Sequence, residues 1–250
     1  MINIKTPSEI EKMAKGGQIL SEVMWRLTSF VKAGVSEIEI DKLAEKLIIE
    51  KGGEPGFKKV DGYNYTVCLS TNDVVVHGIP TDYKLKEGDL IGIDCGVFYQ
   101  GFHTDMSETV IIGENKDSQK EKFLKIGKLA LNEAIEKVKV GNRVGHISKT
   151  IQEIVEGNGY SVVETLVGHG VGRDLHEDPE IPGFLVGEIE ETPTLKEGMV
   201  IAVEVIYNMG KPDLKLDKDG WTLRTQDGSL GGLFERTVAI TKNGPIILTP

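Results

Sequence analysis

The chain has 250 residues, of which 39% are hydrophobic, enough apolar material for a sizeable core. Its 39 acidic and 29 basic residues give a formal net charge of -10, which argues against non-specific binding to nucleic acid or to an anionic membrane. The sequence shows neither an apolar signal core nor an apolar run long enough to span a bilayer, so we expect a cytoplasmic protein without a membrane partner.

The first predicted element is a helix that begins at Thr6. Thr6 can cap the helix, Pro7 suits its first turn, and Glu9 stands at the capping-box position. This helix is expected to run to about Val31. A second helix should stop at the glycines at 52–53, and its expected apolar stripe is Ile38, Leu43, Leu47 and Ile48.

An internal repeat follows. Residues 85–94 (LKEGDLIGID) match residues 195–204 (LKEGMVIAVE) in the turn, in the apolar strand positions and in the final acid. Helical patterns at 120–137 and 144–156 also repeat the first two helices. The chain therefore looks internally duplicated, with too few copies for a solenoid.

The repeat predicts one α+β domain over residues 1–250. Its two pseudo-symmetric halves would cover roughly residues 1–117 and 118–250. Neither a linker nor a low-complexity tract separates them. We expect an antiparallel sheet with the helices packed on one face.

Two aspartates lie in a predicted β-hairpin. Asp94 ends one apolar run and Asp105 begins the next, with glycines between them. If the turn centres on Tyr99 and Gln100, the two aspartates lie directly opposite each other. Facing carboxylates in a buried site repel, so one must bind a proton or a cation must lie between them.

The second half supplies two more acids and a histidine. Glu204 occupies the repeat position of Asp94, and Glu235 lies in another apolar run. One such acid would usually face solvent, but four acids placed by a repeat point to a metal site. His169 lies in a segment whose glycines and proline oppose a helix, so its spacing from His176 is not that of a helical core stripe; two structural histidines are the alternative.

The two cysteines, Cys68 and Cys95, form no Cys-x-x-Cys pair, which predicts neither a disulfide framework nor a thiolate zinc site. Any metal must therefore be held by oxygen and imidazole. A cysteine hydrolase using Cys68 and His77 is an alternative, although Cys68 is expected to pack as a small hydrophobe. His103 and His146 are expected to be structural or surface residues.

The chain contains, in order, NDVVVHGIP around His77, GIDCGVFYQGFHTDMSET around Asp94 and Asp105, GHGVGRDLHEDP around His169 and His176, MVIAVE ending at Glu204, and FERT around Glu235. Together these motifs resemble those of type I methionine aminopeptidases, in the pita-bread family that also holds prolidases and aminopeptidase P. The resemblance covers essentially the whole chain. Few residues separate His176 from Glu204, so the chain looks like the short bacterial form without the type II insertion.

The resemblance implies a pita-bread fold and a hydrolase that removes the initiator methionine from nascent proteins, preferring a small second residue. It implies two divalent metal ions (Co, Mn, Fe or Zn), with Asp105 and Glu235 as bridging ligands. The full implied ligand set is Asp94, Asp105, His169, Glu204 and Glu235. Four carboxylates and two divalent ions also sum to zero charge, in agreement with the argument from repulsion.

The resemblance also implies roles for neighbouring residues. Glu204 would carry a proton to the leaving amine, whereas His77 and His176 would contact substrate without binding metal, His176 near the scissile carbonyl. The methionine pocket would include Phe57, Val60, Tyr63, Cys68, His77, Leu175 and Trp221. Three departures from the family's motifs bear on the shape of this pocket: Leu175, Val205 and Arg236. Phe57 and Val60 also stand at pocket positions where other residues are common in the family.

Two further functions remain alternatives: hydrolysis of the prolidase or aminopeptidase P type, and a non-catalytic binding module on the same fold. Retention of all five implied ligands argues against the binding module. Nascent polypeptide N-termini are the expected partners, and a monomer is expected. The sequence leaves open the native metal and any contact with the ribosome.

Overall fold

The computed structural model describes residues 2–114 and 117–250. Its α-helices are α1 (Pro7–Phe30), α2 (Glu37–Glu50), α3 (Ser118–Ile135) and α4 (Val144–Gly157). The strands are β1 (Glu54–Pro55), β2 (Val67–Thr71), β3 (Val74–Val76), β4 (Leu90–Tyr99), β5 (Phe102–Ile111), β6 (Ser161–Val162), β7 (Val167–Gly170), β8 (Glu177–Pro182), β9 (Val200–Asn208), β10 (Leu214–Leu216), β11 (Leu223–Thr225), β12 (Gly231–Thr241) and β13 (Gly244–Ile247). Two 3-10 turns span Phe57–Lys59 and Ile189–Glu191.

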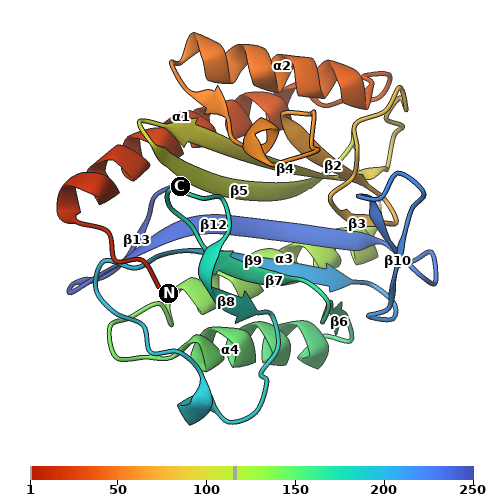
Figure 1. Ribbon diagram of the computed structural model, residues 1–250. Helices are drawn as coiled ribbons and strands as arrows, with labels where there is room; N and C mark the ends of the chain where they lie inside the picture. The colour runs from red at the N-terminus through yellow and green to blue at the C-terminus, as the bar shows by residue number, and fades with distance from the viewer. Residues whose placement is uncertain (1, 115–116) are drawn as a thin grey trace.

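A 10-stranded sheet runs through the middle of the molecule (Figure 1). Its main order is β1-β4-β5-β12-β9-β7-β8, and β2, β6 and β13 join it beside β4, β9 and β12. A 3-stranded sheet has the order β10-β11-β3. The pairings are antiparallel, which confirms the predicted α+β class.

The helices pack on one face of the large sheet. Strand side chains alternate between the two faces, so the apolar residues at every second position gather on the face that the helices cover. The odd-numbered residues of β4 join the core with α1 and α2, and those of β9 join the core with α3 and α4. Figure 1 shows the two helix pairs beside the two ends of the sheet. Even-numbered positions, including Asp94 and Glu204, face the opposite side. The predicted one-sided helix packing is confirmed.

The turns that precede β4 and β9 reveal the internal repeat in three dimensions. Gly88 and Gly198 have φ values of +82° and +85°, a conformation that glycine adopts without steric cost. The same run of strand residues follows each turn, so Asp94 and Glu204 occupy equivalent positions. The single-domain assignment and the boundary near residue 117 remain predictions.

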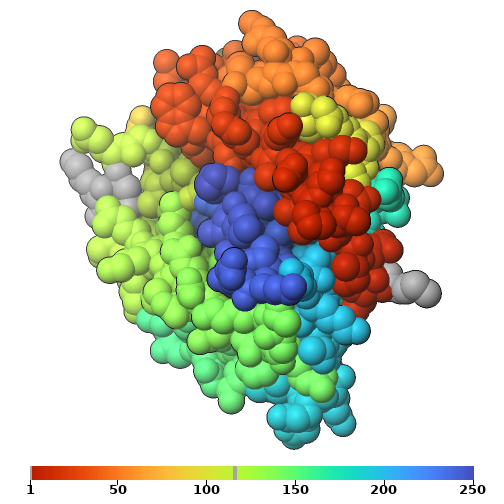
Figure 2. All heavy atoms as spheres, turned by 90° about the vertical axis from the view of Figure 1, so that its left-hand side faces the viewer, coloured from red at the N-terminus to blue at the C-terminus, as the bar shows by residue number. Residues whose placement is uncertain are grey.

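The N-terminal helix begins as predicted. The side chain of Thr6 accepts a hydrogen bond from the backbone N–H of Glu9, whose carboxylate accepts one in return from the backbone N–H of Thr6. Farther along, α1 packs against the C-terminal segment, and Figure 2 shows these red and blue segments side by side. A Cβ at Gly17 would lie 2.0 Å from the carbonyl oxygen of Leu248, so glycine is required there.

The predicted apolar stripe of α2 was partly wrong. The buried positions are Glu37, Ile40, Asp41, Ala44 and Ile48, whereas the other three predicted stripe residues are half-buried. The helix is rotated because its two inward acids make hydrogen bonds: Glu37 accepts one from the Thr71 hydroxyl at 2.7 Å, and Asp41 accepts one from the Thr66 backbone N–H at 2.7 Å. Among the described helices, none is long and apolar enough to cross a membrane.

Candidate metal centre and cavity

Asp94 and Asp105 lie on the same face of the β4–β5 hairpin, but not in the predicted register. The turn lies at Gln100 and Gly101, both with positive φ (+49° and +90°), as a two-residue hairpin turn of the primed type requires. Asp94 is therefore opposite Ser107, not Asp105. The predicted direct pairing was wrong by two residues. Because strand side chains alternate with a period of two, both carboxylates still face one side.

β12 joins the two halves of the site because it lies between β5 and β9. Glu235 is directly opposite Glu204 in β9 and opposite Ser107 in β5. The hydroxyl of Thr237 donates to the carbonyl oxygen of Asp105 and accepts from its N–H, both at 2.8 Å. This strand thus brings carboxylates from both halves of the chain into one cluster.

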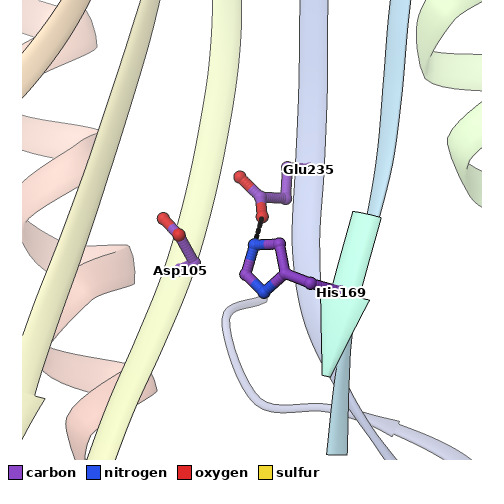
Figure 3. A group of neighbouring side chains, drawn as sticks. All are labelled: Asp105, His169 and Glu235. Carbon is purple, nitrogen blue, oxygen red and sulfur yellow. Dashed lines mark ion pairs between the residues drawn. The ribbon is translucent and has the colours of Figure 1, made fainter. Parts of the chain in front are cut away.

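His169 is oriented for coordination. Its Nδ1 donates to the carbonyl oxygen of Gly170 at 2.9 Å, so Nε2 faces the acids, 3.9 Å from Glu204 Oε1 and 4.0 Å from Glu235 Oε1. Burial lowers the His169 pKa to about 4, so its imidazole is neutral at pH 7. Asp105, His169 and Glu235 each offer a ligand atom that lies within 4.8 Å of those of the other two. Figure 3 shows these side chains grouped from three strands, with the His169–Glu235 ion pair as a dashed line.

The four carboxyl groups are buried together at a cost. Burial raises the pKa of Asp105 to about 7, and burial together with the charge of Asp105 raises that of Glu204 to about 8. Burial and the neighbouring acids also raise the pKa values of Asp94 and Glu235. Among the described residues, Asp94 Oδ1 is buried without a hydrogen-bond partner. This orphaned oxygen, the clustered carboxylates and the neutral imidazole fit a centre for divalent cations.

These raised pKa values predict how the metal-free protein responds to pH. Asp105 and Glu204 stabilise the fold when protonated, and that contribution is lost as pH rises through their folded pKa values of about 7 and 8. His77, His103 and His169, with folded pKa values of about 4, act in the opposite sense, but their effect fades as pH rises above their ordinary pKa of 6.5. Between pH 6.5 and 8 the carboxyl effect therefore dominates.

The melting temperature of chelator-treated protein should accordingly fall between pH 6.5 and 8, by about 2 to 4 °C for each kcal/mol lost. Added divalent ions should abolish most of this fall, because they neutralise the ionised acids. Calorimetry of the chelator-treated protein measures the fall in melting temperature, and the same scans with added Mn²⁺ measure how far the fall is abolished. A melting temperature that rises with pH in the chelated protein would contradict the assignment.

One cavity of about 110 Å³ brings together every residue that the sequence predicts for metal, catalysis or substrate. Its lining residues are Phe57, Val60, Tyr63, Cys68, His77, Asp94, Asp105, His169, Leu175, His176, Glu204, Trp221 and Glu235. Their individual roles remain predictions. Tyr65 and Ile79, which pack against the apolar side of this cavity, were not predicted, although Ile79 falls within the motif around His77.

One side of the cavity is apolar. Phe57, Tyr63, Cys68 and Leu175 form a buried cluster there. The ring of Trp221 stands edge-on to Tyr63 with centroids 5.1 Å apart. The cavity therefore offers an apolar side chain a place beside the carboxylate cluster.

The other two predicted histidines lie at the polar end. The ring of His176 meets that of His169 edge-on, with centroids 4.4 Å apart. His77 follows β3 with φ of +55°, a strained conformation for a non-glycine residue. Burial and the neighbouring His176 lower the pKa of His77 to about 4, so it is neutral at physiological pH.

Two of the three departures from the family pattern face away from the cavity. Val205 is buried in the core with α3 and α4. Arg236 points the same way and donates to Glu108 Oε2 at 2.9 Å and to the carbonyl oxygen of Glu235 at 2.7 Å. Leu175 lines the cavity, as do Phe57 and Val60, so these three positions bear on pocket shape.

Residues 11–242 of the chain match the sequence pattern of metallopeptidase family M24. The chain is 45% identical over 249 residues to the methionine aminopeptidase of Clostridium perfringens, covering 100% of this chain and 99% of that protein. The crystal structure of methionine aminopeptidase from Thermotoga maritima is similar with a TM-score of 0.96 and 40% identity, covering 100% and 99% of the two chains.

A more distant relative bears on the prolidase alternative. The prolidase from Pyrococcus furiosus is similar with a TM-score of 0.80 and 27% identity, covering 99% of this chain but 65% of that one. These structural neighbours confirm the expected pita-bread fold.

Proposed function

Because the chain belongs to metallopeptidase family M24, we propose that it removes the initiator methionine from the N-termini of nascent proteins. One observation carries this proposal: an apolar recess opens directly onto a cluster of four carboxylates and a neutral imidazole within a single cavity. The full-length similarity to methionine aminopeptidases supports the same activity.

The five clustered side chains, Asp94, Asp105, His169, Glu204 and Glu235, would hold two divalent ions. The ions, when bound, supply charge for activating a water molecule and polarising the scissile carbonyl. The side-chain chemistry suits Mn, Fe or Co at least as well as Zn, since four of the five ligands offer oxygen.

Three residues would handle protons and charge. The Glu204 carboxylate would accept a proton from the attacking water and deliver it to the leaving amine. His176 is neutral in this role and donates its N–H to the carbonyl oxygen as negative charge develops there. His77 lies at the same end of the cavity and orients the substrate.

The apolar recess would set the specificity for methionine. An unbranched thioether can fill an irregular space between Tyr63, Cys68 and Trp221 and gains from contact with aromatic rings. The cavity is small, about 110 Å³, so a large second side chain would crowd its mouth.

We therefore expect peptides that begin Met-Ala, Met-Gly or Met-Ser to be cleaved much faster than those that begin Met-Lys. Comparison of kcat/KM over a peptide panel measures this, and N-acetylated Met-Ala peptides, which lack the free amine, serve as a control that should not be cleaved. A preference for Leu at the first position, or for X-Pro dipeptides, would favour a different member of the fold family.

The cysteine-hydrolase alternative is disfavoured by the surroundings of Cys68. Burial and the nearby carboxylate of Asp94 raise the thiol pKa well above its ordinary value, so little nucleophilic thiolate forms. The prolidase alternative rests on a relative with lower identity, whose chain extends well beyond the part matched here.

We place the enzyme in the cytosol, where new N-termini emerge, and propose that it acts as a monomer. Contact with the ribosome remains a prediction.

A further inference from the structure

A buried ion pair ties the N-terminal segment to the turn that carries His176. Lys5 Nζ lies 2.6 Å from Glu177 Oε2, although the two residues are 172 positions apart in sequence. The two side chains are only 5% and 3% exposed. The segment is itself fixed, because the N–H of Lys5 donates to the carbonyl oxygen of Gly198 at 2.7 Å. Figure 2 shows this red segment against light-blue residues of the second half.

The other oxygen of Glu177 closes the turn between β7 and β8. Glu177 Oε1 accepts hydrogen bonds from the backbone N–H groups of Arg173 at 2.8 Å and Asp174 at 3.4 Å. Gly172 allows this close packing, since a Cβ there would lie 2.5 Å from both Glu177 Oε1 and Lys5 Cε. One carboxylate therefore binds Lys5 with one oxygen and the turn backbone with the other.

His176 directly precedes Glu177 and lies within the closed turn. Among the described residues, no side chain is found hydrogen-bonded to its imidazole, and its one ring contact is the edge-on contact with His169. The backbone of the turn must therefore determine where this ring lies. Leu175, which lines the apolar recess, belongs to the same turn.

We propose that the Lys5–Glu177 pair is a positioning device that holds the His176 imidazole at the reacting end of the cavity. The inference rests on the proposed function, because it assigns a role to the pair in the same reaction. The segment before α1 is thereby part of the machinery that presents a residue to substrate.

The charges of the pair depend strongly on each other. Burial alone would raise the pKa of Glu177, but hydrogen bonds from Lys5 and Asn3 bring it below its usual value. Loss of one partner would leave the other as an unpaired buried charge, which draws in water and disturbs its surroundings. By contrast, the Arg173–Glu9 pair on the same turn is exposed at Arg173 and should matter little.

The test is a double-mutant cycle between Lys5→Met and His176→Ala, read as kcat and KM on a Met-Ala peptide. Lys5→Met should lower kcat by roughly 10- to 100-fold with little change in KM, because small misplacement of a catalytic group has such effects. In the His176→Ala background, Lys5→Met should change kcat by less than about twofold, since the two losses share one cause. If Lys5→Met lowers kcat by the same factor in the wild type and in His176→Ala, the proposal is overturned.

Two controls separate positioning from general damage. Lys46→Met removes an exposed pair with Glu50 on α2 and should leave kcat unchanged. Ile151→Ala opens a cavity in the α4 core and lowers stability, yet should leave kcat unchanged well below the melting temperature. If Lys5→Met does not fold, Glu177→Gln keeps one acceptor oxygen for the turn, removes the charge, replaces the second oxygen by an NH2 group, and is read by the same cycle.

A readout without turnover distinguishes failure of this inference from failure of the proposed function. The ring proton resonances of His176, assigned by their loss in His176→Ala, should shift in Lys5→Met and stay in place in Lys46→Met. If wild-type protein cleaves no methionyl peptide, the proposed function fails and these resonances alone decide the positioning. Unchanged His176 resonances in Lys5→Met would overturn it.

Discussion

Replacement of Asp105 by asparagine should lower hydrolysis of methionyl peptides by roughly 1,000-fold or more, as should removal of divalent cations with a chelator. Asp105 lies where strands from both halves meet, and its carboxylate lies within 4.8 Å of ligand atoms of His169 and Glu235. Asparagine keeps the shape but removes the charge that two cations would share. Adding Mn²⁺, Co²⁺ or Fe²⁺ should restore the chelated wild type and leave Asp105→Asn inactive.

Metal content and kcat/KM, measured on the same samples, check this result. Asp89→Asn is the matched control, because Asp89 is also buried but its carboxylate is occupied by Asn72 and Tyr83. It should retain both metal and activity. Cys68→Ala should retain the hydrolytic chemistry, whereas a cysteine hydrolase would survive the chelator and lose its activity in Cys68→Ala. Activity that survives thorough chelation, with no metal detectable, would refute the metal mechanism.

Replacement of His176 by alanine should lower kcat by roughly 100-fold, the usual loss when a donor to a developing oxyanion is removed. Metal binding should persist, because His176 touches the coordinating cluster only through its edge contact with His169. His176→Gln retains an N–H donor and should lose less. Steady-state kinetics of the two variants measure the loss of turnover, and metal titration measures whether metal binding persists.

His146→Ala is the control for loss of a histidine. His146 lies on α4, where its Nδ1 accepts a hydrogen bond from the Arg143 backbone N–H, so the change should affect stability and not turnover. If His176→Ala instead empties the metal centre, His176 is a ligand and its assigned role is wrong.

The sequence predicted the members of the site better than their geometry. The LKEG repeat placed Asp94 and Glu204 at equivalent positions, and strand alternation put them on one face whatever the register. The register itself depends on which two residues of the turn adopt positive φ. Gln100 does so, and glutamine carries no strong signal for that conformation.

The long-range ion pair of the N-terminal segment had no sequence signal. The Lys5–Glu177 pair joins residues 172 positions apart, and neither residue belongs to a pattern that predicts the other. The orientation of Val205 and Arg236 could have been predicted, because each follows a residue that faces the cavity and must therefore face the helices. Only the strand assignments were needed for that conclusion.

The place of β12 in the sheet also constrains the order in which the molecule can be assembled during synthesis. β12 is inserted between β5 and β9, yet it follows both in sequence. Because synthesis proceeds from the N-terminus, β5 and β9 are made before β12. Until β12 is made, each has an unpaired edge that can pair with another chain. With the proposed ligand set, cation binding must wait as well, because Glu235 arrives with the strand that closes this gap. A newly made molecule is therefore most prone to aggregate just before it becomes able to hold its metal.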